Sequence, residues 1–197
     1  IKLLDPSIVT IANNHIFDHG EKGLKSTLEQ LSGHKIQYVG AGLNINEASQ
    51  PVILERQNRK IGVYACAEHE FSIADEEHAG ANPIDPLESF GHISTLKSKS
   101  DAVIVLHHGG KEHYRYPSPE LQRICRKMVK SGADLVVCQH SHCIGSYEKY
   151  GNGTIVYGQG NFLFDRRDDE FWSTGLLVRA TIGESLEVEF LPIIKSG

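Results

Sequence analysis

The sequence lacks the features that would place it in a membrane or on nucleic acid. None of its apolar runs approaches the roughly 18 residues that a membrane-spanning helix needs. Its N-terminus has no basic segment followed by an apolar stretch. Positive charge is not in excess either, because the formal net charge is -5 at pH 7. We therefore expect no nucleic-acid partner, since such proteins carry a basic surface.

Cysteine is scarce as well. The four cysteines lie in or beside apolar runs, which is not the pattern of a disulfide framework. One local alternative is a zinc site in which Cys138 and Cys143 join the histidines between them. Structural zinc sites usually use paired Cys-x-x-Cys or His-x-x-x-His spacings, so this alternative is the weaker one. Histidine is abundant by contrast, with 11 in 197 residues, and the placement of these histidines is the main clue to function.

Strand and helix patterns alternate along the first two thirds of the chain. Short, β-branched apolar runs predict buried parallel strands at residues 8–12, 102–106 and 135–138. Helices are predicted at residues 119–131, at residues 21–32 and from residue 85 onward. This alternation indicates an α/β fold.

The local signals for two of these helices are specific. Ser118 precedes Pro119 at the start of one helix, and Gly132 follows its end. The helix expected from Asp85 has proline at its first position and Glu88 in a capping box, with Leu87, Phe90 and Ile93 facing inward.

The last third of the chain has a different pattern. Residues 147–158 predict a β-hairpin around the Gly-Asn-Gly turn at 151–153, and further strands are predicted at 175–182 and 186–192. The best loop candidate is the segment 68–83. This part of the fold is expected to be antiparallel or mixed sheet.

Each of the three predicted parallel strands ends in residues of metal-binding type, which are Asn14 and His15, His107 and His108, and His140 and His142. In open α/β sheets the ligand site lies outside the carboxyl ends of the strands, so these endings should converge. Two imidazoles at positions i and i+2 of a turn can face one cavity. Imidazole together with amide oxygen suits Mn, Fe or Zn rather than Ca.

Several motifs resemble one known family. The segment ANNHIFDHG at 12–20 resembles the NHxFDxG signature of calcineurin-like metallophosphoesterases, which 5′-nucleotidases share. The segment 106–142 is similar to the successive motifs LHWG, PSPEQ and GADLVVGHHPH of the CapA family, which is linked to bacterial poly-γ-glutamate capsule synthesis. GAGLNINEA at 40–48 and YGQGNFLFD at 157–165 resemble two further motifs of that family. The resemblance covers most of the chain.

The resemblance implies a metallophosphoesterase-like layered α/β sandwich (αββα), formed as a single domain by residues 1–197. The family's first two motifs, a strand ending in GD and a segment bearing NxE, would precede Ile1, and Asp5 matches neither. The domain is therefore expected to be N-terminally incomplete and to lack its N-terminal strand or strands. Because the absent motifs carry carboxylates, we expect weakened metal binding and at most one ion.

The resemblance also assigns roles by position. It implies that Asn14, His107, His140 and His142 are metal ligands. His15 would donate a proton or contact the transition state, and Asp18 would orient His15 by accepting a hydrogen bond from it. Asp18 could instead cap the helix that follows.

Three further residues are placed around the pocket. His108 stands where the family usually has Trp and would line the pocket rather than bind metal. Asn161, of the GNF motif, would lie near the site or hold a turn. Arg115, with the neighbouring His113 and Tyr114, would be loop surface or contact substrate. The cations expected to meet a polyanion are Lys111, Arg115, Arg166 and Arg167.

The function implied is hydrolysis of a phosphomonoester or phosphodiester by a metal-bound water. The cofactors would be divalent ions of Mn, Fe or Zn, two of them in a complete parent domain. The substrate would be phosphorylated or polyanionic. Family members are often extracytoplasmic, so a membrane anchor preceding this chain and a membrane-bound capsule synthesis machinery as partner are implied. Two alternatives are a non-catalytic polymer-handling or scaffold protein on the same fold and a 5′-nucleotidase-like hydrolase.

Overall fold

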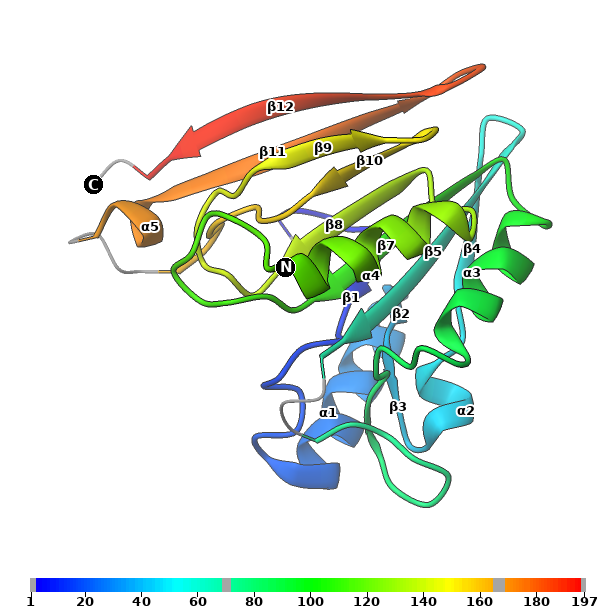
Figure 1. Ribbon diagram of the computed structural model, residues 1–197. Coiled ribbons are helices and arrows are strands. Elements are labelled where there is room, and N and C mark those ends of the chain that lie inside the picture. Colours follow the sequence, from blue (N-terminus) through cyan, green and yellow to red (C-terminus); the bar gives the residue numbers. More distant parts are fainter. Residues whose placement is uncertain (1–2, 69–71, 165–168, 196–197) are drawn as a thin grey trace.

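The computed structural model describes residues 3–68, 72–164 and 169–195, and its largest element is a six-stranded mixed sheet (Figure 1). The strands, from one edge to the other, are β4 (Val52–Arg56), β5 (Arg59–Ala67), β7 (Ala102–His108), β8 (Leu135–Gln139), β10 (Gly153–Val156) and β9 (Tyr147–Tyr150). The four central strands are parallel, and both edge strands are antiparallel to their neighbours. The carboxyl ends of β5, β7 and β8 therefore share one edge of the sheet.

Two helices, α3 (Ser89–Lys97) and α4 (Pro119–Lys130), cover one face of this sheet (Figure 1). The apolar side of α4 packs its buried Leu121, Cys125 and Met128 into the main core. Ser118 accepts a hydrogen bond from the Leu121 amide, and the backbone of Gly132 has a φ of 119° after the last turn. The predicted start and end signals of this helix are confirmed.

Two separate pairs of strands pack on the opposite face of the main sheet and form the second layer of strands. One is the parallel pair β1 (Ile8–Thr10) and β2 (Gln37–Val39), which α1 (Gly20–Gly33) covers from outside. The other is the long ribbon β11 (Thr174–Ile182) and β12 (Leu186–Ile194), which packs on β8 and β10 (Figure 1). Helices therefore lie outside two layers of strands, which confirms the metallophosphoesterase-like αββα sandwich.

The remaining elements are short. The strands β3 (Ala41–Gly42) and β6 (Gly80–Ala81) pair with each other, and β6 lies inside the segment predicted as a loop. The two short helices are α2 (Ile45–Ala48) and α5 (Glu170–Ser173). In the stretches that the structure describes, no helix is both long and apolar enough to cross a membrane.

Two predictions about the elements need correction. The helix expected from Asp85 begins at Ser89, because the Asp85 carboxylate accepts a hydrogen bond from the Leu87 amide and closes a turn there. Leu87, expected to face inward, is exposed. The strand predicted at residues 8–12 is shorter, and it belongs to the facing two-stranded sheet rather than to the main one.

Candidate functional site

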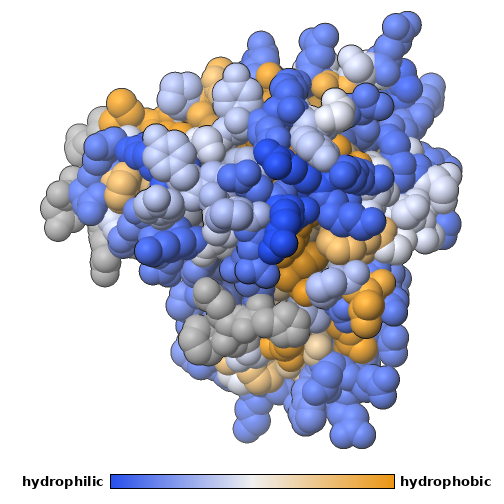
Figure 2. Space-filling model, in the orientation of Figure 1, coloured by the Kyte–Doolittle hydropathy of each residue, from blue (hydrophilic) through white to orange (hydrophobic). Residues whose placement is uncertain are grey.

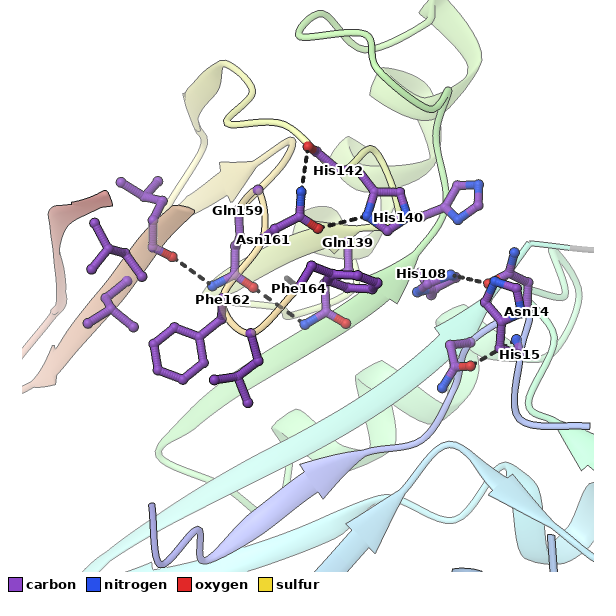
Figure 3. Close-up of a pocket in the computed structure, with 16 residues that line it drawn as sticks. Asn14, His15, His108, Gln139, His140, His142, Gln159, Asn161, Phe162 and Phe164 are labelled. Carbon is purple, nitrogen blue, oxygen red and sulfur yellow. Dashed lines mark hydrogen bonds between the residues drawn. The ribbon is translucent and has the colours of Figure 1, made fainter. Parts of the chain in front are cut away.

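A pocket of about 630 Å³ opens beside the carboxyl ends of β7 and β8. Figure 3 shows its polar side, where side chains from the β1–α1 loop meet side chains from β7 and from the loop after β8. The residues that line the pocket are Asn13, Asn14, His15, His108, Gln139, His140, His142, Gln159, Gly160, Asn161, Phe162, Leu163, Phe164, Leu176, Leu177 and Ile193.

Asn14 and His108 join the two sheets at this pocket. The Nε2 atom of His108 lies 3.0 Å from Oδ1 of Asn14, although 94 residues separate the two in the chain (Figure 3). Burial, followed by electrostatic interaction with His140 and His107, lowers the pKa of His108 to about 3. This imidazole is therefore neutral at ordinary pH, which is the form that binds metal ions.

The loop after β8 presents His140 and His142 with a strained backbone. Their φ angles are 94° and 54°, a region that non-glycine residues seldom occupy. Asn161 fixes the ring of His142. Its Nδ2 donates to the carbonyls of His142 and Phe171, so its Oδ1 accepts from Nδ1 of His142 at 2.8 Å. The proton then sits on Nδ1, and Nε2 of His142 keeps the lone pair that could bind a metal.

Trp172 closes this part of the site. Its ring stacks on His142, with centroids 4.5 Å apart and an interplanar angle of 26°. Phe164 meets the same imidazole edge-on at 5.2 Å. Because the sequence has one tryptophan, its fluorescence reports on the surroundings of His142.

His15 and Asp18 form the predicted contact at the rim of the pocket. Nδ1 of His15 donates to Oδ2 of Asp18 over 2.9 Å, and both side chains are exposed. Asp18 does not cap α1, since the N-cap residue is His19 and no side chain caps that end. The hydrogen bond is confirmed, and its catalytic role stays a prediction.

His107 is not brought into the pocket. Successive strand residues face opposite sides of a sheet, so His107 points with Val103 and Val105 into the core beneath the helices. It is fully buried, and its Nδ1 lies 3.5 Å from Sγ of Cys66. The structure therefore places His108, and not His107, in the pocket beside Asn14, and the ligand role expected of His107 stays a prediction.

Arg115 also lies outside the lining of the pocket. Its guanidinium donates to Oε1 of Glu170 at 2.6 Å and covers the ring of Phe171 at 4.8 Å. Lys111 lies over the ring of Tyr114. The other two cations expected to meet a polyanion, Arg166 and Arg167, lie outside the described residues.

One wall of the pocket is apolar. It is formed by the segment 162–164 and by Leu176, Leu177 and Ile193 of the β11–β12 ribbon. Figure 2 shows that apolar residues also reach the surface at the upper left, near the end of this ribbon. The last residue of β12, Ile194, is 78% exposed. The sequence pattern did not predict this wall, because alternation along a strand does not reveal which of its faces borders a distant pocket.

Glu68 is a further residue near the site that the sequence pattern did not single out. It follows β5, whose last pair in the sheet is Ala67 with His108, so Glu68 stands at the edge that carries the histidines. Its carboxylate comes within 3.7 Å of Nε2 of His107. The signal was present in the apolar run of residues 61–67 that ends directly before this glutamate.

The zinc alternative is not supported. Cys138 lies in the helix-covered core, where its Sγ is 3.5 Å from Sγ of Cys125. All four cysteines are free and buried. Among the residues that the structure describes, no three His, Cys, Asp or Glu side chains are grouped closely enough to hold a metal ion.

Solved structures support the fold. A hypothetical protein from Thermus thermophilus matches with a TM-score of 0.65 and 12% identity over 99% of this chain and 79% of its own. A phosphatase from Mycoplasma pneumoniae matches with a TM-score of 0.57 and 14% identity over 95% of this chain and 72% of its own. At these identities the likeness concerns the fold alone.

Sequence relatives identify the family. The capsule biosynthesis protein CapA of Bacillus anthracis is 32% identical over 166 residues, which are 81% of this chain and 40% of that protein. The PGA biosynthesis protein CapA of Bacillus subtilis (strain 168) is 30% identical over 170 residues, or 84% and 44%. The chain thus spans less than half the length of these curated relatives. The family model for the bacterial capsule synthesis protein PGA_cap matches residues 1–166, and the chain belongs to that family.

Proposed function

We propose that this chain carries a metal-dependent phosphoesterase-type site and acts in the synthesis of a capsule polymer such as poly-γ-glutamate. One observation carries the proposal: Asn14, His108, His140 and His142, from two sheets, line one pocket. His15, with its partner Asp18, stands at the same pocket.

The donor set fits a divalent ion of the transition series. The side chains supply imidazole nitrogen and amide oxygen, which suit Mn, Fe or Zn. His108 is kept neutral, and His142 is held with its Nε2 lone pair available. Asn14, His108, His140 and His142 would hold the ion, with His108 in the place first given to His107. To do so, the three imidazoles would have to come closer together than they lie in the structure. Once bound, the ion would polarise a phosphoryl oxygen and lower the pKa of a water.

The proton chemistry would belong to His15. Asp18 accepts from Nδ1, which fixes the tautomer of the ring and leaves Nε2 to exchange a proton with a leaving oxygen. The substrate would be phosphorylated or polyanionic. This agrees with the names of the relatives in Bacillus, which concern capsule and PGA biosynthesis.

A second candidate is a non-catalytic protein that handles the polymer. It is favoured by the lack, within the described residues, of three His, Cys, Asp or Glu side chains gathered as a metal site. The apolar wall of the pocket would then serve binding rather than chemistry.

The first prediction separates these candidates. Metal content after Mn loading and hydrolysis of bis-p-nitrophenyl phosphate would be measured for the parent chain and for a His140→Ala, His142→Ala double variant. We expect the parent to bind up to one ion and the double variant to lose it, because two of the imidazole ligands are gone. Turnover that disappears with the metal supports hydrolysis.

The matched control is a His34→Ala, His78→Ala double variant, which removes two exposed histidines remote from the pocket. It should bind Mn as the parent does. Equal Mn content in the parent and the His140, His142 variant would contradict the metal site. Metal binding without any turnover of phosphoesters would favour the polymer-handling protein.

A further inference from the structure

Glu68 stands at the carboxyl end of β5, beside the strand end that carries His107 and His108. Its backbone amide donates to the carbonyl of His108 over 2.9 Å, which extends the pairing of β5 with β7 by one residue. The side chain is 31% exposed, so it is held mostly within the protein. The tight approach needs Gly109. A Cβ at that position would lie 2.6 Å from Cδ of Glu68.

His107 faces this carboxylate with a buried ring nitrogen. Its Nε2 makes no hydrogen bond among the described residues and lies 3.7 Å from Oε1 of Glu68. On the other side of the ring, Nδ1 lies 3.5 Å from Sγ of Cys66. Burial raises the pKa of Cys66, so the thiol stays protonated and can donate to Nδ1. The ring proton of His107 is then on Nε2, facing Glu68.

Glu68 also keeps its negative charge. Interaction with His107 lowers its pKa more than burial raises it, and the backbone amide of Gly110 and electrostatic interaction with His140 lower it further. Another carboxylate, that of Glu112, comes within 3.9 Å of His140, but its side chain is 54% exposed. Solvent screens an exposed charge more strongly than a half-buried one.

We propose that Glu68 is a positioning residue of this pocket, which anchors the ring of His107 and places a fixed negative charge behind His140 so that the pocket holds a divalent cation more tightly. The proposal rests on the proposed metal site. It assigns to this chain an anionic group that its sequence motifs did not reveal. A carboxylate behind metal-binding imidazoles commonly increases metal affinity.

The test is calorimetric titration of Mn²⁺ into the parent chain and into Glu68→Gln, which keeps the shape of the side chain and removes its charge. We expect the affinity to fall about ten- to a hundredfold. Gly109→Ala should weaken binding similarly, because the new methyl group takes the place of the carboxylate while the charge remains in the chain. Glu112→Gln is the matched control and should change the affinity less than about threefold.

Two readouts separate positioning from folding. Thermal unfolding without metal shows whether a variant is folded. If Glu68→Gln does not fold, the Mn²⁺ affinity of Gly109→Ala tests the role of Glu68 instead. Two-bond ¹H–¹⁵N spectra of the histidine rings should show the Nε2–H tautomer for His107 in the parent and an altered ring signal in Glu68→Gln.

The outcomes also separate this proposal from the function on which it rests. If His140→Ala abolishes Mn²⁺ binding while folded Glu68→Gln and Gly109→Ala bind as the parent does, the role of Glu68 is refuted and the metal site stands. If the parent binds no Mn²⁺ at saturation, both are refuted. Weakened binding in both variants, with Glu112→Gln unchanged, supports the role of Glu68.

Discussion

At the scale of single residues, the two neighbouring histidines at the end of β7 point to opposite faces of the sheet. His107 is enclosed by the core, while His108 reaches Asn14 across the gap between the two sheets. The family resemblance pointed to the first of the pair. Strand alternation and the packing of β7 instead place His108 in the pocket.

The second prediction therefore compares His107→Ala with His108→Ala. Removing His107 leaves a cavity and an unpartnered Cys66 thiol, so urea unfolding should show a loss of about 1–3 kcal/mol. His108→Ala should cost less stability but lower the affinity for Mn²⁺, because it removes a donor from the pocket. Tight Mn²⁺ binding by His108→Ala, with loss in a folded His107→Ala, would return the ligand role to His107.

The third prediction concerns the contact between His15 and Asp18. Asp18→Asn removes the carboxylate charge and offers an amide that can either accept from Nδ1 or donate to it, so the ring tautomer is no longer fixed. Turnover of a phosphodiester should therefore fall about tenfold or more. Binding of Mn²⁺ should not change, because neither side chain is among the proposed ligands. Glu21→Gln, in the first turn of α1, is the control for loss of one exposed carboxylate nearby. Unchanged turnover in Asp18→Asn would remove the dyad and leave the metal site intact.

At the scale of elements, β5 organises the site although it does not line the pocket. It is nine residues long, pairs with β4 and β7, and ends directly before Glu68. Its buried Tyr64 donates from its hydroxyl to Oγ of Ser89 at 3.2 Å, which ties the strand to the start of α3. Burial is the main cause that raises the pKa of Tyr64 to about 12.

The fourth prediction concerns how the stability of the protein changes at alkaline pH. A tyrosine in the unfolded chain titrates near pH 10, so between about pH 10 and 12 the folded state holds a proton that the unfolded state has released. Stability should therefore be intact below pH 10 and fall as the pH rises toward 12. Urea unfolding across this range should show a shallower decline for Tyr64→Phe than for the parent. Equal slopes would mean that Tyr64 does not contribute.

At the scale of the whole molecule, separate apolar cores pack the helices on one face of the main sheet and the two strand pairs on the other. The helix-covered core contains Cys66, Cys125 and Cys138, and Cys143 is buried in the loop beside the pocket. Burial raises the pKa of Cys66, and contact with Cys125 followed by burial raises that of Cys138. These thiols should be unreactive while the protein is folded.

The fifth prediction uses them as probes of unfolding. At pH 8 a chromogenic disulfide reagent should modify less than one thiol per native chain during the time in which urea-unfolded chain reacts at all four. The native rate should rise with urea in parallel with the unfolded fraction. Prompt reaction of a thiol in the native protein would indicate local opening of the core near that residue.

Local signals in the sequence predicted much of the fold and part of the site. Helix α4 was predicted closely because Ser118, Pro119 and Gly132 are local start and stop signals. The convergence of strand ends brought Asn14, His140 and His142 to one pocket as expected. The predicted start of α3 was wrong, because a turn closed by the side chain of Asp85 competed with the helix.

What the sequence alone determined is the types of side chain that the pocket can offer, since imidazole and amide donors follow the strands in motifs typical of one family. What only the tertiary structure decided is which of these side chains share a space. The pairing of β1 with β2 in a separate sheet, the opposite directions of His107 and His108, and the approach of Glu68 beneath Gly109 all depend on contacts between distant segments. The physical reason is that a pattern along the chain fixes the type and period of an element, whereas its register and facing follow from the packing of the whole core.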